Sequence, residues 1–391
     1  MPTRPLIIVS LEGIAPHALS CYGCSWNQTP SLDRIAANGL LWDRLTANTD
    51  LPGNLFSSWT SSQVEWAKRF RSIGPLVLIS DDDLLELGEH CFDEITLLPF
   101  ESVQENQVAE EEAFQTRFGQ LVATAIDRIR QPEAMGAIWI HSSFLTRCWD
   151  APIKPMESVT EFEYLEEPIE LESNQEANDA NEVEHSNEVC SKLVIPPSFQ
   201  ITPEDDPDLI PQWIDRYGSQ VGLIDMMMDY LLEEAEQMDA QIVFLGTSGF
   251  RLGQGGEFGT KPEKLRSGDI HLPLLIGSEA TLRIPHLTCS EQVPEILKSL
   301  AIEGEPTYTA DQWAQSRSNS PVIPIQSSRT ASAVMSPKWF CVIDSDSAEN
   351  LFLKPDDVDD YNNVARLRPD VVDELIALSN QSSNPSSLIE G

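Results

Sequence analysis

The 391-residue chain predicts an α/β fold with one large, mostly parallel sheet covered by helices on both faces, and a small C-terminal α+β subdomain. The main observation is an alternation of short apolar runs with longer segments whose apolar residues recur at helical spacing. A second observation is the length, since 391 residues with 41% hydrophobic side chains are enough for a sizeable core. We place the main domain at residues 1–325 and the subdomain at residues 326–391.

Apolar runs and amphipathic segments follow one another along the main domain. Strands are expected at 6–11, 75–79, 137–141, 241–246 and 272–276. Helices are expected at 30–38, 108–130 and 215–236. The first helix has a favourable start at Thr29-Pro30-Ser31 and a favourable end at Asn38-Gly39. In the C-terminal part, we expect short strands near 333–343 and 350–353 and a helix at 366–379.

Three segments near the N-terminus follow one another at characteristic spacing. The first strand ends at Glu12-Gly13 and is followed by Cys21-Tyr22-Gly23 and by a Thr-Pro-Ser-Leu-Asp-Arg segment at 29–34. In order and spacing, these pieces resemble the opening of the sulfatases, which are members of the alkaline-phosphatase-like superfamily. The resemblance continues downstream in segments at 217–232, 241–246, 252–261, 270–276, 336–340, 350–352 and 373–375. It implies an alkaline-phosphatase-like fold over most of the chain, with a poor match at about 60–135.

The resemblance also implies a divalent cation site, but most of its ligands have changed. Sulfatases take two Asp from the end of the first strand, where this chain has Glu12 and Gly13. They take two more ligands from an Asp-His or Asp-Asn pair, where this chain has Thr247 and Ser248. Neutral hydroxyls are poor replacements, because calcium and magnesium need hard, mostly anionic oxygen ligands to offset their dehydration. We therefore expect no metal, with Glu12 as the weak candidate ligand.

The nucleophile of the family is also missing. The Cys-x-Pro-x-Arg segment of sulfatases aligns so that Pro52 stands at the nucleophile and Phe56 at the Arg. Three acids, at 81–83, stand where sulfatases have basic residues for the anion. His141 and Lys261 match polar residues of the family pocket, although a hydrogen-bonded strand end and a solvated loop lysine are simpler interpretations. The former pocket would thus comprise six residues, none of them expected to be catalytic: Glu12, Pro52, His141, Thr247, Ser248 and Lys261.

Composition excludes some partners. The formal net charge is −38, so nucleic acids and anionic membranes are disfavoured. No apolar stretch approaches the roughly 20 residues of a membrane span. Seven scattered cysteines and the lack of a recognisable secretory signal favour a reducing, cytoplasmic location. The acidic tract at about 155–195 is expected to be a disordered insertion that either aids solubility or docks a basic partner.

Three functional hypotheses remain. The first is a sulfatase-like protein that has lost hydrolysis of sulfuric esters and acts through binding or assembly. The second is an active sulfate or phosphate ester hydrolase with a rebuilt calcium or magnesium site, using Glu12, Asp50 and the acids at 81–83. The third is an acidic interaction protein for basic partners. The sequence favours the first hypothesis, because it requires only the observed losses. The natural ligand or partner is left open.

Overall fold

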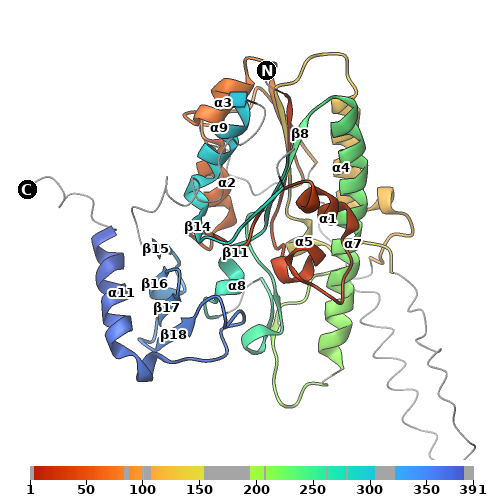
Figure 1. The fold of residues 1–391 in the computed structure, drawn as a ribbon. Helices are drawn as coiled ribbons and strands as arrows, with labels where there is room; N and C mark the ends of the chain where they lie inside the picture. Colours follow the sequence, from red (N-terminus) through yellow and green to blue (C-terminus); the bar gives the residue numbers. More distant parts are fainter. Residues whose placement is uncertain are drawn as a thin grey trace, which may run out of the picture.

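The computed structural model describes residues 4–82, 88–98, 100, 107–153, 194–206, 208–260, 263–278, 281–303 and 322–382. The acidic tract, apart from its last two residues, lies outside the described residues, as do Asp83 and Lys261. Figure 1 shows a central sheet between two groups of helices, with a smaller sheet and one helix at the C-terminal side. Among the described residues, no helix is long and apolar enough to cross a membrane.

The central sheet has eight strands in the order β13-β2-β12-β8-β1-β6-β4-β5. All strands point the same way except β12, which runs antiparallel to both of its neighbours. The mostly parallel sheet expected from the sequence is therefore confirmed. The strands are β1 (Leu6–Leu11), β2 (Gly39–Trp42), β4 (Leu76–Ser80), β5 (Glu94–Leu97), β6 (Ala137–Ser142), β8 (Gln241–Gly246), β12 (Leu274–Gly277) and β13 (Leu282–Ile284).

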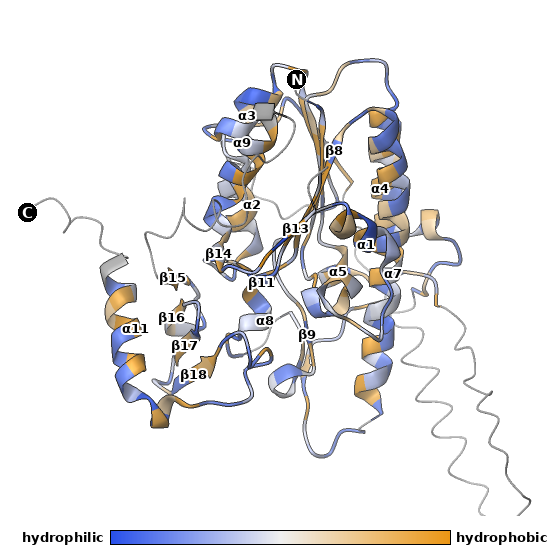
Figure 2. Cartoon of the chain, viewed as in Figure 1, coloured by the Kyte–Doolittle hydropathy of each residue, from blue (hydrophilic) through white to orange (hydrophobic). Residues whose placement is uncertain are grey.

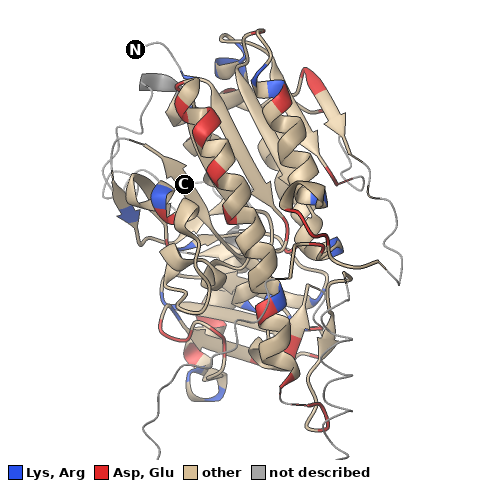
Figure 3. Ribbon diagram, turned by 90° about the vertical axis from the view of Figure 1, so that its right-hand side faces the viewer, with Lys and Arg blue, Asp and Glu red and all other residues tan. Residues whose placement is uncertain are grey.

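Alternating side chains of the strands build two core layers, one on each face of the sheet. Leu6 and Ile8 join one buried cluster, whereas Ile7 and Val9 join the other. Because both faces are covered, the central strands are hydrophobic along their length (Figure 2). Figure 3 shows acidic and basic residues mainly on the outer helices and loops, with the central strands largely free of both.

Each face of the sheet is covered by its own set of helices. One face carries α1 (Pro30–Ala37), α4 (Arg117–Ile129) and α7 (Leu209–Gln237). The other face carries α2 (Pro52–Thr60), α3 (Glu65–Phe70) and α9 (Val293–Glu303). Helices on both faces were expected, but the sequence did not locate those of this second set. Pro-Gly-Asn at the start of α2 is typical of a turn, and α3 is very short.

Two expected helices have different limits in the structure. The helix expected from residue 108 begins only at Arg117, because the side chain of Thr116 accepts a hydrogen bond from the Gly119 amide (3.0 Å) and caps the helix there. The helix expected from residue 215 begins earlier, at Leu209. Trp213 and Tyr217 are buried in the core, so tertiary packing extends α7 beyond its clearest periodic part.

The strand expected at 272–276 is interrupted. Pro273 has no amide hydrogen to donate, and the chain changes sheet at this residue. On one side, β11 (His271–Leu272) pairs with β3 (Leu45–Thr46), which also pairs with β14 (Thr288–Cys289). On the other side, β12 enters the central sheet. A further small sheet joins β7 (Phe199–Gln200), β10 (Glu257–Gly259) and β9 (Arg251–Leu252).

The C-terminal part is a four-stranded antiparallel sheet with one long helix. Its strands are β15 (Ile323–Pro324), β16 (Thr330–Met335), β17 (Trp339–Asp344) and β18 (Glu349–Leu353). The region near 333–343 thus contains two strands, joined by a turn in which Ser336 Oγ accepts the Trp339 amide (2.9 Å). One face of this sheet packs on α11 (Pro369–Ser382). Phe340 and Phe352, on the other face, join the core of the main domain.

Candidate functional site

The ends of β1, β6 and β8 bring most of the sequence-predicted site residues to one edge of the sheet. Leu11 is paired with Ser142 and with Gly246 in the two parallel ladders. The Glu12 amide donates to the Ser142 carbonyl (2.9 Å), and the Thr247 amide donates to the Leu11 carbonyl (2.8 Å). The half-buried Glu12 therefore lies beside the segment that contains Thr247 and Ser248.

Gly13 stands where the resemblance implies a second Asp, and its surroundings leave no room for a side chain. Its φ of +79° is in the left-handed region that favours glycine. A Cβ added there would lie 2.6 Å from Thr146 Cγ2 and 3.7 Å from Phe250 Cδ2. The space beside Gly13 is thus filled by side chains from α5 (Phe144–Arg147) and from the loop after β8.

The turn at Gly13 is held by hydrogen bonds from two other segments. The Gly13 amide lies 2.9 Å from Ser248 Oγ and 3.1 Å from the Ser248 carbonyl oxygen, both of which are acceptors. The Tyr217 hydroxyl donates to the Gly13 carbonyl (2.8 Å) and accepts from the Ala15 amide (2.9 Å). The hydroxyl of Ser248 therefore stabilises the loop.

Thr247 differs from Ser248 because its hydroxyl makes no hydrogen bond within the described part of the chain. The residue is only 1% exposed. An unpaired buried hydroxyl costs free energy relative to an apolar group of the same shape.

Phe56 and His141 are in contact next to this edge, and Pro52 precedes Phe56 on the same helix. Pro52 is the first residue of α2, a favourable position for proline. One turn later, Phe56 is fully buried, and its ring centroid lies 4.5 Å from that of His141. The Nδ1 atom of His141 lies 2.7 Å from Ser10 Oγ, which accepts a hydrogen bond from the Trp139 indole (2.7 Å). Burial lowers the pKa of His141 to about 3, so the ring is neutral near pH 7.

The acidic side chains that the rebuilt-site hypothesis groups at 81–83 have different contacts where the structure describes them. Asp81 accepts hydrogen bonds from the Ser142 hydroxyl (2.6 Å) and the Ser143 amide (2.9 Å), and burial raises its pKa to about 7. Asp82 lies 3.6 Å from Arg147 Nη1 and 3.9 Å from His141 Nε2. No group of three or more His, Cys, Asp or Glu side chains in the described residues is arranged to hold a metal ion.

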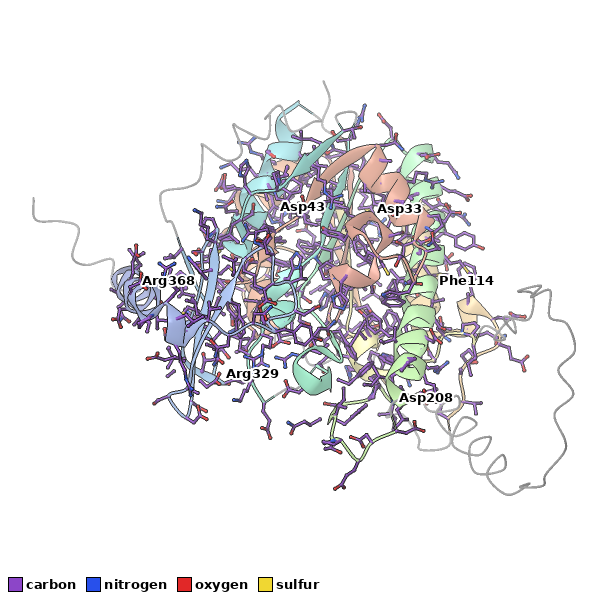
Figure 4. All side chains as sticks on the ribbon, turned by 60° about the horizontal axis from the view of Figure 1, so that its bottom comes forward. Asp33, Asp43, Phe114, Asp208, Arg329 and Arg368 are labelled. Carbon is purple, nitrogen blue, oxygen red and sulfur yellow. The ribbon has the colours of Figure 1, made fainter. Side chains whose placement is uncertain are left out.

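Asp50 points toward the C-terminal sheet and belongs to a chain of ion pairs that the sequence did not suggest. Its Oδ2 accepts from Arg329 Nε (2.8 Å), and Arg329 Nη1 lies 3.3 Å from Asp269. Asp269 in turn accepts two hydrogen bonds from Arg251 (2.9 and 2.7 Å), and Arg251 also pairs with Glu257. Figure 4 shows Arg329 between the C-terminal sheet and the rest of the molecule. These residues are scattered along the chain, so no local motif indicates the network.

A cavity of about 380 Å³ lies beside this network. Its walls come from the segment after β1, the loops around β3 and β9, α8 (Ser267–Ile270) and the C-terminal part. Arg44, Arg251 and Arg266 line it, together with His17 and His271. Of the former pocket, the five residues that the structure describes do not line this cavity: Glu12, Pro52, His141, Thr247 and Ser248. No local motif links the three arginines and two histidines of the cavity, because they come together only through tertiary structure.

The overall architecture has clear counterparts among solved structures, although no family model and no curated protein sequence matches the chain. A protein solved with its substrate D-glucosamine-2-N,6-O-disulfate has a TM-score of 0.67 and 14% identity, covering 99% of this chain and 100% of that chain. A phosphonate monoester hydrolase of Agrobacterium radiobacter has a TM-score of 0.63 and 14% identity, with coverages of 97% and 96%. A 2-O GAG sulfatase has a TM-score of 0.61 and 11% identity, with coverages of 97% and 92%. The chain therefore has the alkaline-phosphatase-like fold that these sulfatases and phosphonate monoester hydrolases share.

Proposed function

We propose that this sulfatase-like protein has lost hydrolysis of sulfuric esters and acts through binding or assembly. The observation that carries the proposal is the contact around Gly13. A side chain at this position would collide with Thr146 Cγ2 and would require a strained backbone. These contacts support the proposal, because they leave no space for a carboxylate at the position where the resemblance implies the second Asp.

The remaining donors are a poor match for calcium or magnesium. Glu12 is the one carboxylate at the four positions that correspond to metal ligands in the resemblance. Ser248 Oγ already accepts the Gly13 amide, and the hydroxyl of Thr247 carries no charge. Because hard divalent ions bind most strongly to several anionic oxygens, this set favours a centre without a resident metal.

The covalent step of a sulfatase has no residue to carry it in this arrangement. Pro52 has no nucleophilic atom, and the nearby Phe56 packs on the neutral ring of His141. A buried aromatic pair cannot attract a sulfate ester in the way that an Arg and a charged His do. The rebuilt hydrolase is the weaker hypothesis, because Asp50 is engaged by Arg329 and Asp81 by Ser142.

The direct test is an assay of the full chain with 4-nitrophenyl sulfate, 4-nitrophenyl phosphate and a phenylphosphonate monoester. Each substrate is tested with added calcium, magnesium or manganese. We expect release of nitrophenol or phenol at the background rate, since metal activation and covalent attack each contribute a large part of such rates. Hydrolytic activity that co-purifies with the protein and is lost in Glu12→Ala would show that the chain is a hydrolase with a rebuilt site.

A further inference from the structure

We propose that the cavity between the main domain and the C-terminal sheet, here called the side cavity, binds a small molecule with an oxyanion group. Arg266 and Arg44 would contact the anion. The side cavity holds about 380 Å³ and is lined by Tyr22, Arg44, Phe250, Arg266, His271 and Met335, among others. This volume is within the range of small-molecule pockets, roughly 300–1,000 Å³.

Most cationic side chains of the side cavity are already paired with carboxylates. Arg251 pairs with Asp269 (2.7 Å), and Arg283 pairs with Asp43 (2.7 Å). Lys354 Nζ lies 2.5 Å from Asp360 Oδ1. Within each pair, the two opposite charges neutralise each other and stabilise the cavity wall. These side chains therefore leave little net charge for a ligand.

Arg266 and Arg44 are different, because no carboxylate of the described residues forms an ion pair with either. Arg266 Nε is buried without a hydrogen-bond partner in the described part of the chain, and the guanidinium lies over the ring of Phe352 at 5.4 Å from its centroid. Arg44 donates to the Pro337 carbonyl (2.9 Å), and burial lowers its pKa. An oxyanion would supply the missing acceptor for Arg266 and a counter-charge for both arginines.

The two histidines of the side cavity supply polarity without charge. His271 Nε2 lies 2.8 Å from the Asp43 carbonyl oxygen, and His17 Nε2 lies 3.2 Å from Gln254 Nε2. Burial lowers the pKa of each histidine to about 4. Both rings are therefore neutral near pH 7.

Apolar side chains complete the walls and define the rest of the ligand. Phe250 and Met335 are buried, and the ring of Tyr22 meets the ring of His271 edge to face at 6.4 Å. Asp359 also lines the cavity, and burial raises the pKa of its carboxyl. These surfaces fit a compact ring or short apolar group that carries the oxyanion at one end.

This inference deepens the proposed function, because it gives a binding protein a site and a ligand class. It rests on the proposed function in one respect, namely that the ligand is bound and is not hydrolysed. Glu12, Pro52, His141, Thr247 and Ser248 do not line the side cavity, so its ligand and the former centre can be tested separately.

Calorimetric titration of the full chain with phenylphosphonate tests the inference. Its phosphorus–carbon bond has no ester to hydrolyse, so binding can be measured even if the chain were an enzyme. Inorganic phosphate is the second probe, and benzamide is the uncharged control. We expect phenylphosphonate to bind more tightly than phosphate, and benzamide to give no saturable signal. Arg266→Gln and Arg44→Gln should each weaken phenylphosphonate binding at least about tenfold, as expected for the loss of one charge-assisted hydrogen bond.

Two further variants separate the side cavity from other anion sites. Arg366→Gln removes an exposed arginine outside the cavity lining, and Glu12→Ala alters the former centre. Both should leave phenylphosphonate affinity unchanged. If Arg266→Gln does not fold, Arg266→Lys keeps the charge but loses the planar fork, and should still weaken binding measurably. Absence of binding by both anions, equal loss in Arg366→Gln, or loss only in Glu12→Ala would each overturn the inference.

Discussion

Gly13→Ala tests directly whether the former carboxylate position is filled. The added Cβ has two separate costs. At a φ of +79°, a residue with a side chain is strained by about 1–2 kcal/mol. The contact of 2.6 Å with Thr146 Cγ2 requires a shift of closely packed atoms, which typically costs about 1–3 kcal/mol. We expect a total loss of roughly 2–5 kcal/mol in the free energy of unfolding.

Thr146 cannot turn away without losing a contact, which is why the steric part should be measurable. Its Oγ1 donates to the Ser143 carbonyl (2.9 Å), and this hydrogen bond fixes the position of the methyl group. Thr146→Ser keeps the hydroxyl and removes the methyl. The double variant Gly13→Ala/Thr146→Ser should therefore recover most of the steric part and none of the backbone strain.

Gly23→Ala is the matched control for the backbone strain. Gly23 also has a positive φ, of +96°, but an added Cβ would meet no atom within 4 Å. Urea unfolding of the unmodified chain and of the four variants, followed by circular dichroism with a common m value, gives the comparison. If Gly13→Ala costs no more than Gly23→Ala, and Thr146→Ser recovers nothing, the argument that the position is filled is wrong.

Three further predictions concern charge, metal and the acidic tract. The folded-state pKa of Asp81 is raised from 3.8 to about 7, so its contribution to stability is fully present below about 4 and is lost as the pH rises through about 7. Asp81→Asn should reduce the slope of the unfolding free energy against pH between about 4 and 7, whereas the exposed control Asp346→Asn should not. An unchanged slope in Asp81→Asn would contradict the raised pKa of Asp81. Calorimetry with calcium or magnesium should detect binding no tighter than millimolar; one micromolar site that Glu12→Ala removes would refute this. Replacing residues 157–191 with a short Gly-Ser linker should move the thermal midpoint by only a few degrees, or about 1 kcal/mol. A molten near-ultraviolet spectrum of the deleted protein would show that the tract packs on the core, and loss of a captured partner would favour the acidic interaction hypothesis.

The sequence was sufficient to locate the four central parallel strands β1, β4, β6 and β8, because buried parallel strands are nearly continuous apolar runs. It did not locate β2, β5 and β13. Strands 6–11 and 241–246 agree with β1 and β8 residue for residue. Elements that depend on tertiary packing were missed or displaced. The start of α2 at Pro52-Gly53-Asn54 is typical of a turn, and the break at Pro273 moves neighbouring residues into different sheets.

The position of the candidate site also followed from the sequence, whereas its contacts did not. Parallel strand ends meet at one edge, so Glu12, His141 and Thr247 could be placed together in advance. The contact of Thr146 with Gly13 joins residues far apart in the chain, and no periodicity indicates it. The same is true of Asp50, which the rebuilt-site hypothesis groups with the acids at 81–83. In the structure, Asp50 binds Arg329 in the C-terminal part.

Under the proposed loss of hydrolysis, the residues of the former centre depend on one another. A glycine at position 13 permits the methyl of Thr146 to occupy the vacated space, and the same turn places the Gly13 amide against Ser248 Oγ. Phe56 packs on His141, and burial keeps this histidine neutral near pH 7. Restoring Asp at position 13 alone would place a carboxylate against the methyl of Thr146 and disturb the bond to Ser248. We therefore expect that no single reversion restores metal binding, since a working centre would require Thr146, Thr247 and Ser248 to change together with Gly13.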